Sequence, residues 1–594
     1  MHSAKPSAMR LPLFLAFALL VCRVAAMPSF SGTEPLTIAP GKTGEVKVIG
    51  NGFGDDLRLW TSFGVAKLVK RINAQQAIFT ITAPADANGV GVLRLHDRSG
   101  LSDARFIAFD STPATKKIST DKTKPALLKL PAAIDSKTGG VHSHWFAFDA
   151  KAGQRLAIEV FAERIGSGAD PMIRLLNPMG REVNYADDDE VLGSDAGLVH
   201  TAKQTGQYRL ELRDVQYRGG QAYRLRVGDF EIWPKVRPAS GAVIEKEPNN
   251  TPAQATPLSL GQPAFGRIEE PGARDHFSFT GKKDDWVTIR AFSRSVGSPA
   301  YIYLELLNKD GSAIATAGTE NTRQTVLRHR LPAAGAYTLR VEELIRAGGP
   351  HHAYRLTTHA GRGAFQLNLK TDKNKADRFW AIPGQQVNLP LQIERHDYDG
   401  AITLAADWTA AEPIQAKAKD FTAKFTVPAN AKPGTLHHLR ITGVGEGDSP
   451  AKSTLDLLAA HRARWPQLAF PPAALRNVVP VAVIAPTRIT VADIKLKAGA
   501  KAKVRVTTLR PPPPIGQKAA PQPIAITLKN LPDGIKAPEK ITVATNKNFV
   551  EFELSAPAET AAGKHSLVVI AKGKYRGADW THEGQPVALE VLPK

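Results

Sequence analysis

Two stretches of the chain decide the fold: HWFAFDAKAGQ at residues 144–154 and DHFSFTGKKDD at residues 275–285. In each stretch two phenylalanines stand at alternate positions, Phe146 and Phe148 in the first and Phe277 and Phe279 in the second. Side chains at every second position of a β-strand share one face of the sheet. The pattern therefore predicts a strand with one face on a core and the other in water, followed by a polar turn.

The two stretches belong to an internal repeat with a period of about 130 residues. Further matches follow in the same order: Leu176, Asn177 and Gly180 with Leu307, Asn308 and Gly311; Gly206-x-Tyr208 with Gly335-x-Tyr337; Gly219-Gly220 with Gly348-Gly349; and Tyr223-Arg224-Leu225 with Tyr354-Arg355-Leu356. Most of these anchors are expected to be core and turn residues. The chain thus holds two copies of one sandwich, at residues 115–235 and 242–362.

Outside the repeat, the same two-residue alternation continues, as in Val46 and Val48, Val504 and Val506, and the run from Val387 to Ile393. With 594 residues the chain is too long for one core. We predict an all-β protein of serial antiparallel β-sandwiches, jelly-roll or immunoglobulin-like, with about five domains. Besides the two copies, these domains are expected at residues 27–112, 364–465 and 488–594, with 466–487 as a linker; short linkers favour an extended array.

The N-terminus has the pattern of a secretory signal peptide. Lys5 and Arg10 precede the apolar run Leu11–Val21, and Val24-Ala25-Ala26 offers small residues for cleavage, so residues 1–26 are expected to be removed. Lipidation at Cys22 is an alternative. Cys22 is the one cysteine, so a chain cleaved after Ala26 has no disulfide or thiolate metal site. We expect no transmembrane segment in the mature chain and a periplasmic, cell-surface or extracellular location.

The composition is basic, with 77 Lys and Arg against 56 Asp and Glu and a net charge of +21. The charges are dispersed, and no nucleic-acid-binding motif is present, so nucleic acid is not an expected partner. An anionic ligand, such as an acidic polysaccharide, and a solvated basic surface are the two interpretations that remain. A protein ligand is the other class of partner considered.

The repeats resemble the bacterial pre-peptidase C-terminal (PPC) domain. The features that carry the resemblance are Glu245-x-Glu247-Pro248-Asn249-Asn250, Asp275-His276-Phe277-Ser278-Phe279 and the Gly-x-Tyr and Tyr-Arg-Leu matches. The resemblance implies a β-sandwich that accompanies secreted proteases and that binds calcium in some members. Carried over residue by residue, it implies calcium ligands at Glu245, Glu247, Asn249, Asn250 and Asp275.

This sequence departs from the family pattern at two places. Asn250 stands where an aspartate is common, and Arg274 precedes Asp275 where a second acid is expected. A network of turns that holds the linker is therefore the alternative to calcium. In the first copy, the segment 127–137 offers only Asp135, so no site is expected there.

The flanking regions resemble other bacterial modules. Residues 27–112, with Gly50-Asn51-Gly52-Phe53-Gly54, resemble an IPT/TIG sandwich, and the last two regions resemble bacterial immunoglobulin-like domains. This order resembles that of exported planctomycete-type proteins. Such resemblance implies fold more than function.

No catalytic motif is found in the sequence. His582-Glu583 lacks the second histidine of a zinc-protease helix, and Gly447-Asp448-Ser449-Pro450 lacks the glycines around a catalytic serine. The sequence predicts an exported non-catalytic protein that acts in binding, adhesion or as a scaffold. The alternative is an accessory or targeting partner of a separately encoded secreted peptidase or other hydrolase. The ligand and the oligomeric state stay open.

Overall fold

The computed structural model describes residues 27–594 except 190, 234–235, 320–324, 362, 371–376, 411, 448–449, 466–471, 511–520 and 576–577. The expected signal peptide, Cys22 and part of the expected linker thus lie outside the described residues. The described chain is almost entirely β, with 47 strands and two short α-helices. This confirms the predicted all-β class. None of the described helices is long and apolar enough to cross a membrane.

The N-terminal sandwich consists of two sheets, in the strand orders β1-β3-β6-β5 and β2-β9-β7-β4. Its core contains Val46, Val48 and Phe79, which the alternating pattern places on one face. Gly50 lies so close to β1 that a Cβ there would meet the carbonyl oxygen of Ser29 at 1.9 Å. The strands are β1 (Ser29–Glu34), β2 (Thr37–Ile38), β3 (Thr43–Asn51), β4 (Arg58–Thr61), β5 (Val65–Arg71), β6 (Gln76–Thr82), β7 (Val90–Asp97), β8 (Gly100–Leu101) and β9 (Arg105–Phe109).

The first repeat folds into sheets with the orders β10-β12-β19-β14-β17 and β11-β13-β18-β15-β16. Phe146 and Phe148 lie in its core, as the alternation predicts. The elements are β10 (Ala114–Thr115), β11 (Ala126–Leu127), β12 (Ala132–Gly139), β13 (His144–Ala150), β14 (Arg155–Phe161), η1 (Glu163–Ile165), β15 (Pro171–Leu176), β16 (Glu182–Ala186), β17 (Gly197–Thr201), β18 (Gly206–Asp214) and β19 (Gly219–Gly228).

The second repeat has the same strand order, β20-β22-β29-β24-β27 and β21-β23-β28-β25-β26. Phe277 and Phe279 are buried at the positions of Phe146 and Phe148, so the repeat in the sequence is also a repeat of structure. The elements are β20 (Val243–Ile244), η2 (Pro252–Gln254), β21 (Thr256–Pro257), β22 (Ala264–Arg267), β23 (Arg274–Gly281), β24 (Trp286–Phe292), η3 (Arg294–Val296), β25 (Ile302–Leu307), β26 (Ala313–Ala317), β27 (Thr325–Arg330), β28 (Gly335–Glu343) and β29 (Ala353–Gly361).

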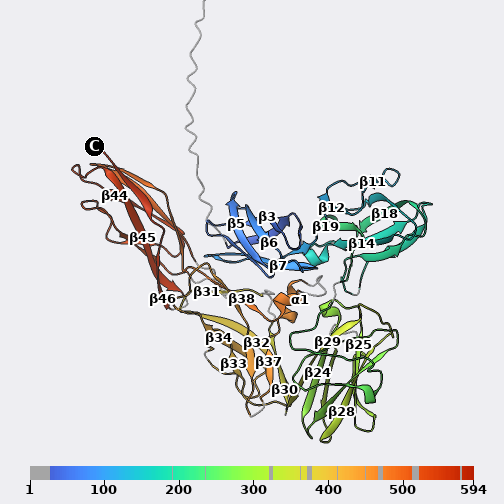
Figure 1. Cartoon of the computed structure of the whole chain (residues 1–594). Coiled ribbons are helices and arrows are strands. Elements are labelled where there is room, and N and C mark those ends of the chain that lie inside the picture. Colours follow the sequence, from blue (N-terminus) through green and yellow to red (C-terminus); the bar gives the residue numbers. More distant parts are fainter. Residues whose placement is uncertain are drawn as a thin grey trace, which may run out of the picture.

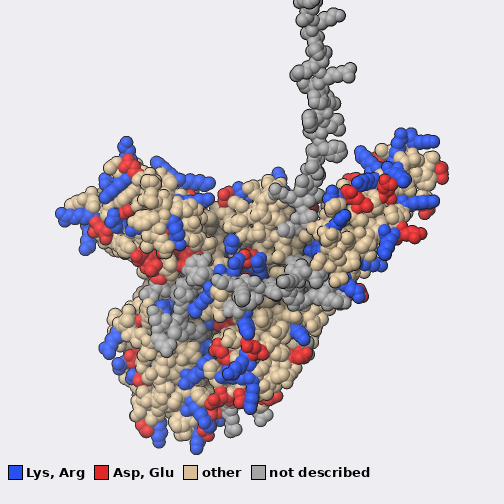
Figure 2. All heavy atoms as spheres, turned by 180° about the vertical axis from the view of Figure 1, so that it is seen from behind, with Lys and Arg blue, Asp and Glu red and all other residues tan. Residues whose placement is uncertain are grey.

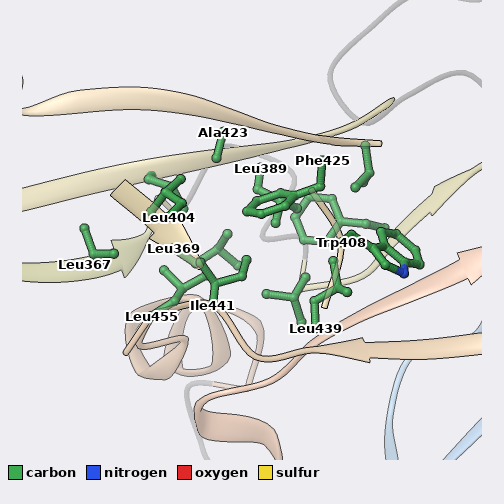
Figure 3. Packing of buried hydrophobic residues seen from close by; sticks show 14 of the residues in the cluster. Leu367, Leu369, Leu389, Leu404, Trp408, Ala423, Phe425, Leu439, Ile441 and Leu455 are labelled. Atoms are coloured by element: carbon green, nitrogen blue, oxygen red, sulfur yellow. The ribbon is translucent and has the colours of Figure 1, made fainter. Parts of the chain in front are cut away.

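The fourth sandwich has three small sheets, β30-β32-β34, β31-β38-β35 and β33-β36-β37. Leu389, Phe425 and Leu439 are among the residues that meet in its core (Figure 3). The elements are β30 (Ala364–Leu369), β31 (Phe379–Ala381), β32 (Gln386–His396), β33 (Thr403–Ala405), β34 (Asp420–Thr426), β35 (Leu436–Leu439), β36 (Thr442–Val444), β37 (Lys452–Thr454), α1 (Leu458–Arg464), α2 (Ala473–Arg476) and β38 (Val479–Val483).

Strand β38 corrects the expected linker at 466–487. All five of its residues are buried, and it pairs with β31 on one side and β35 on the other. Val479, Val481 and Val483 belong to the core of the fourth sandwich. The alternating valines of this segment therefore form a central strand, although prolines before and after it suggested a connection.

The C-terminal sandwich joins a β39-β41-β44 sheet to a second sheet in the order β40-β47-β45-β42-β43, with β46 beside β45. In Figure 1 it projects from the rest of the molecule. Its strands are β39 (Arg488–Val491), β40 (Ile494–Lys497), β41 (Lys501–Leu509), β42 (Ile524–Lys529), β43 (Ile541–Val543), β44 (Phe549–Ser555), β45 (Gly563–Tyr575), β46 (Ala578–Glu583) and β47 (Val587–Leu592).

The chain folds back on itself, so the expectation of an extended array is wrong. The N-terminal sandwich lies against the fourth sandwich and α1 (Figure 1). A buried ion pair joins them, with Arg94 Nη2 2.5 Å from Asp377 Oδ2. Two apolar clusters also join the sandwiches, one with Phe106 and Trp465 and the other with Leu101 and Ile484. The interface buries side chains that a linear string of domains would leave in solvent.

The first repeat is also docked on the N-terminal sandwich. Arg224, on β19, donates two hydrogen bonds to Asp110 Oδ2, which follows β9. Ala108 packs beside this pair against Phe161 and Ile165 of the repeat. The N-terminal sandwich thus contacts both the first repeat and the fourth sandwich and fixes their relative positions.

Two histidines should make the contact between the N-terminal and fourth sandwiches sensitive to acid. His96 Nδ1 lies 3.0 Å from the carbonyl oxygen of Gly434, and the rings of His438 and Trp60 have centroids 4.3 Å apart. Burial lowers the pKa of His96 and of His438 to about 4. A histidine in the unfolded chain titrates near ~6.5, so the unfolded chain binds more protons between these two values. Stability should therefore fall as the pH falls from about 6.5 to about 4.

The measurement is the urea midpoint of the full chain at pH 7.5 and at pH 4.5, for the wild type and for a His96→Gln, His438→Gln variant. The variant should lose less of its midpoint on acidification, because glutamine does not take up a proton. An equal drop in both proteins would show that other groups cause the acid sensitivity.

Candidate metal centre

The segment that leads into the second repeat carries four of the five expected ligands. Strand β20 ends at Ile244, and the turn Glu245–Asn250 follows it directly. Asp275 stands near the start of β23, on the same face as Phe277 and Phe279 by strand alternation, so its carboxylate is buried. Strand β20 pairs with β22, which brings the turn to the end of the core where Asp275 lies.

Three carboxylates converge at this point. Glu245, Glu247 and Asp275 each offer an oxygen, and these oxygens lie within 4.8 Å of one another. Glu247 is exposed, Glu245 is half-buried and Asp275 is buried. The group thus extends from the surface into the end of the core, as a site that a solvated cation can enter.

Tyr354, on β29, lies beneath the two inner carboxylates. Its hydroxyl donates to Asp275 Oδ2 at 2.6 Å and lies 3.1 Å from Glu245 Oε2. A phenol has a single hydrogen to donate, so it can serve only one of these oxygens at a time. Glu245 accepts further hydrogen bonds from the Arg267 backbone N–H and from Asn249 Nδ2, but none of these donors carries a charge. A proton or a cation is therefore still needed to offset two ionised carboxylates.

The pKa values of Glu245 and Asp275 also indicate that a proton or a cation must lie between the two carboxylates. Burial, with the neighbouring charge of Glu245, raises the pKa of Asp275 to about 9. Burial also raises the pKa of Glu245. Two carboxylates at this depth cannot both be ionised unless a positive charge joins them.

Asn249 brings an amide group to the same place and is fully buried. Its backbone N–H donates to Glu247 Oε2 at 2.9 Å, and its Nδ2 donates to Glu245 Oε2 at 3.3 Å. Its Oδ1 is buried and has no hydrogen-bond partner among the described residues, and the same holds for Asp275 Oδ1. An unpaired buried oxygen costs ~1–3 kcal/mol, so two of them at one cluster indicate a missing cation or water.

Asn250 is the one expected ligand that has another role in the structure. It is exposed, and its Oδ1 accepts a hydrogen bond from the Arg274 backbone N–H at 3.4 Å. The Arg274 guanidinium, expected to repel a cation, instead pairs with Glu342, with Nε 3.1 Å from Oε1. The structure therefore brings together Glu245, Glu247, Asn249 and Asp275, and directs the charge of Arg274 to the neighbouring strand.

Two residues of the site were missed in the sequence. Tyr354 matched Tyr223 of the first repeat and was read as a core anchor. Gly266, on β22, faces Tyr354, and a Cβ at Gly266 would lie 2.3 Å from Tyr354 Oη and 2.4 Å from Glu245 Oε2. The absence of a side chain at Gly266 leaves the room that the carboxylates occupy.

The first repeat fills the equivalent place differently. Ser136 pairs with Tyr223 as Gly266 pairs with Tyr354, and His144 stands 131 residues before Asp275. His144 Nδ1 lies 2.7 Å from Tyr223 Oη, so a single neutral pair replaces the carboxylate cluster. Burial lowers the pKa of His144, which keeps its ring neutral.

Residues 127–137 of the first repeat, which we had compared with the acidic turn of the second repeat, do not correspond to that turn. Strand β10 pairs with β12 as β20 pairs with β22, so the leading turn of the first repeat begins after Thr115. That turn carries Lys116 and Lys117. By this register Lys116 stands where the second repeat has Glu245, and Ile118 stands where it has Glu247, so the turn of the first repeat lacks both glutamates.

The acidic run at 187–189 in the first repeat forms a turn. Asp189 Oδ1 accepts hydrogen bonds from the backbone N–H groups of Val191 and Leu192 at 2.8 and 2.9 Å. Asp189 Oδ2 accepts from Trp233 Nε1 at 3.0 Å. Its oxygens are engaged in holding the loop.

The donor set of the second repeat fits a hard divalent cation. Calcium takes six to eight oxygen ligands from carboxylates, amide carbonyls and water. Three carboxylates and one amide oxygen supply part of such a shell, and the exposed side at Glu247 admits water. Thiolate and imidazole donors, which softer metals prefer, are not among the converging groups.

Comparisons with known proteins give partial matches, and no family model matches the chain. A probable subtilase-type serine protease of Deinococcus radiodurans is 35% identical over 169 residues, which is 25% of this chain and 23% of the protease. The chain thus spans about a quarter of the length of that curated relative.

Among solved structures, the pre-peptidase C-terminal domain of a Bacillus anthracis collagenase matches 18% of this chain and 94% of that domain, at 20% identity and a TM-score of 0.15. Fibronectin(III)-like modules of Clostridium thermocellum CbhA match 38% of this chain and 94% of theirs, at 14% identity and a TM-score of 0.13.

Proposed function

We propose that this chain is an exported, non-catalytic binding or scaffold protein whose second repeat is stabilised by calcium. The observation that carries the proposal is the convergence of Glu245, Glu247 and Asp275 around buried oxygens that lack partners. The ion supplies positive charge that lets both inner carboxylates ionise. Glu245, Glu247, Asn249 and Asp275 hold it, while Tyr354 orients the carboxylate of Asp275.

The ion would act on the fold and not on a substrate. Glu245, Glu247 and Asn249 lie in the turn that leads into the repeat, and Asp275 lies on a core strand. A cation shared between them ties the leading segment to the sandwich. A ligand that binds only the folded state stabilises it by RT ln(1 + [L]/Kd), or ~2.7 kcal/mol at a hundred times Kd.

Hydrogen–deuterium exchange of the chelator-treated full chain, with and without calcium, tests this role. Calcium should slow exchange in residues 243–250 and 274–281 and leave the first repeat unchanged, since its leading turn lacks the two glutamates. Glu247→Gln should remove the effect, and Asp187→Asn, the same charge change in the first repeat, should keep it. Equal protection of both repeats, or no protection at all, would exclude calcium as the stabilising ligand.

Export rests on the N-terminal sequence. Mass spectrometry of the protein recovered from the periplasm, surface or medium should show a chain that begins at Met27. A lipid-modified Cys22 at the N-terminus would instead assign the chain to a membrane surface, and an uncleaved chain in the cytoplasm would contradict export.

A role as partner of a secreted peptidase is the second candidate, and the partial match to a subtilase-type protease favours it. In that case the purified chain should co-sediment with a subtilase-type protease exported by the same cell. Independent sedimentation of the two proteins at micromolar concentration would exclude a stable complex.

A further inference from the structure

A polar cavity lies between the second repeat and the fourth sandwich. Its volume is about 320 Å³. The repeat contributes the outer face of the β24, β27 and β29 sheet, with Thr288, Arg328 and His359. The fourth sandwich covers this face with Lys452 on β37 and Arg476 at the end of α2. The cavity is thus built from both domains.

Strand register brings the repeat's polar groups into one row. Thr288 pairs with Arg328 on one neighbouring strand and with His359 on the other. Arg290 stands two residues beyond Thr288, so it extends from the same face. Core residues Val287 and Ile289 alternate with Thr288 and Arg290, which fixes the polar residues on the outside of the sandwich.

Three polar atoms of this row are buried without a partner. Arg328 Nε, Thr288 Oγ1 and His359 Nε2 have no hydrogen-bond partner among the described residues. Buried polar atoms in folded proteins are almost always paired. Three unpaired groups able to donate, side by side in a cavity, call for an acceptor that occupies it.

The charge around the cavity is positive. Arg290, Arg328, Lys452 and Arg476 line it, with Asp456 as the one lining acid. Asp456 is engaged, since its Oδ2 lies 2.9 Å from Arg476 Nη2. Glu394, outside the lining, accepts a hydrogen bond from Asn368 at 2.8 Å.

The excess positive charge acts directly on Arg290 and Arg328. Arg290 donates one hydrogen bond to Gln366 Oε1 at 3.1 Å, which is a neutral acceptor. Burial, followed by repulsion from Arg328, lowers the pKa of Arg290. Burial also lowers the pKa of Arg328. A bound anion would relieve both costs.

We propose that this cavity binds an oxyanion, the carboxylate or sulfate group of an acidic sugar or the corresponding small ion. A guanidinium presents its N–H groups in a planar fork that matches such oxygens. Arg328, Thr288 and His359 donate from the repeat, and Lys452 supplies charge from the fourth sandwich. The site deepens the binding role proposed above, and it uses none of the calcium ligands.

Elsewhere, positive and negative side chains are mixed, as Figure 2 shows for one face of the molecule. A dispersed surface charge attracts anions over a distance but does not select one. A cavity with several aligned donors can select.

Calorimetric titration of the full chain with sodium sulfate, sodium phosphate and sodium glucuronate tests the proposal, at constant ionic strength set with chloride. We expect saturable binding of at least one of these anions, with one site per chain. Arg328→Gln should weaken it by roughly tenfold or more, because a charged donor is lost. Arg330→Gln is the matched control, since Arg330 lies on the same strand but is exposed and pairs with Asp284 at 3.1 Å.

Two further variants keep the test decisive. Thr288→Val removes one donor without changing charge and should also weaken binding, which covers the case in which Arg328→Gln does not fold. Glu247→Gln should leave anion binding intact, so a failure of the calcium site is distinguishable from a failure here. Tighter binding of glucuronate assigns the ligand to acidic sugars, and tighter binding of the inorganic ions assigns it to a free anion.

Absence of saturable heat for all three anions would overturn the proposal. Equal weakening by Arg328→Gln and Arg330→Gln would also overturn it, because general surface charge would then account for the binding.

Discussion

Replacement of Asp377 by alanine should destabilise the chain by ~3–5 kcal/mol, since it leaves a buried arginine without its counter-ion. Arg94 and Asp377 are both about 1% exposed at their side chains, and they pair across the contact between the N-terminal and fourth sandwiches. Burial alone raises the pKa of Asp377, but the nearby Arg94 and His461 outweigh it and lower the pKa. Asp377 is therefore a charge that the interface requires.

Urea unfolding of the full chain measures this effect on the transition that includes the two sandwiches. Asp420→Ala is the control, since Asp420 forms an exposed pair with Lys370 at 3.0 Å and should contribute less than ~1 kcal/mol. An Arg94→Met, Asp377→Leu double variant should recover much of the loss, because it removes both charges. If Asp377→Ala is no more harmful than Asp420→Ala, the buried pair does not hold the two sandwiches together.

Replacement of Gly266 by serine should abolish the calcium response and destabilise the second repeat by ~1–3 kcal/mol, through overpacking. The added Cβ would lie 2.3 Å from Tyr354 Oη and 2.4 Å from Glu245 Oε2. In the first repeat Ser136 stands at this register, and His144 takes the place of Asp275. Serine would thus give the second repeat the packing of the first without its histidine.

Thermal unfolding of Gly266→Ser with and without calcium provides the measurement. Gly32→Ser is the control, since a Cβ there has nothing within 4 Å. The control should keep the calcium-dependent rise in melting temperature. A Gly266→Ser protein that still responds to calcium like the wild type would place the ion elsewhere.

Local patterns in the sequence predict the cores of the repeats well. The alternation of Phe146 with Phe148 and of Phe277 with Phe279 depends only on strand geometry, and all four are buried. The resemblance to the PPC domain likewise pointed to Glu245, Glu247 and Asp275, which the structure brings together. The match to that family's motif, residue by residue, nominated them.

Features that depend on long-range pairing could not be read in the same way. The roles of Tyr354 and Gly266 follow from the pairing of β22 with β29, which joins residues about 90 positions apart. Arg94 and Asp377 are separated by 283 positions, and no local pattern marks either one. Strand β38 was taken for a linker because Pro480 and Pro486 stand within a valine-rich run. Strand β31 pairs only with Val481–Val483, so Pro480 has a paired strand on the β35 side alone, as a residue of an edge strand does.

The most direct test of the central claim is a calorimetric calcium titration of the chelator-treated full chain, with Glu247→Ala, Asp275→Ala as the comparison. The account predicts saturable binding of one calcium ion per chain in the wild type and none in the double variant. The one-to-one ratio is decisive, because the first repeat has the same strand order and lacks the carboxylates. No saturable heat, or binding that survives in the double variant, would contradict the assignment of a calcium site to the second repeat.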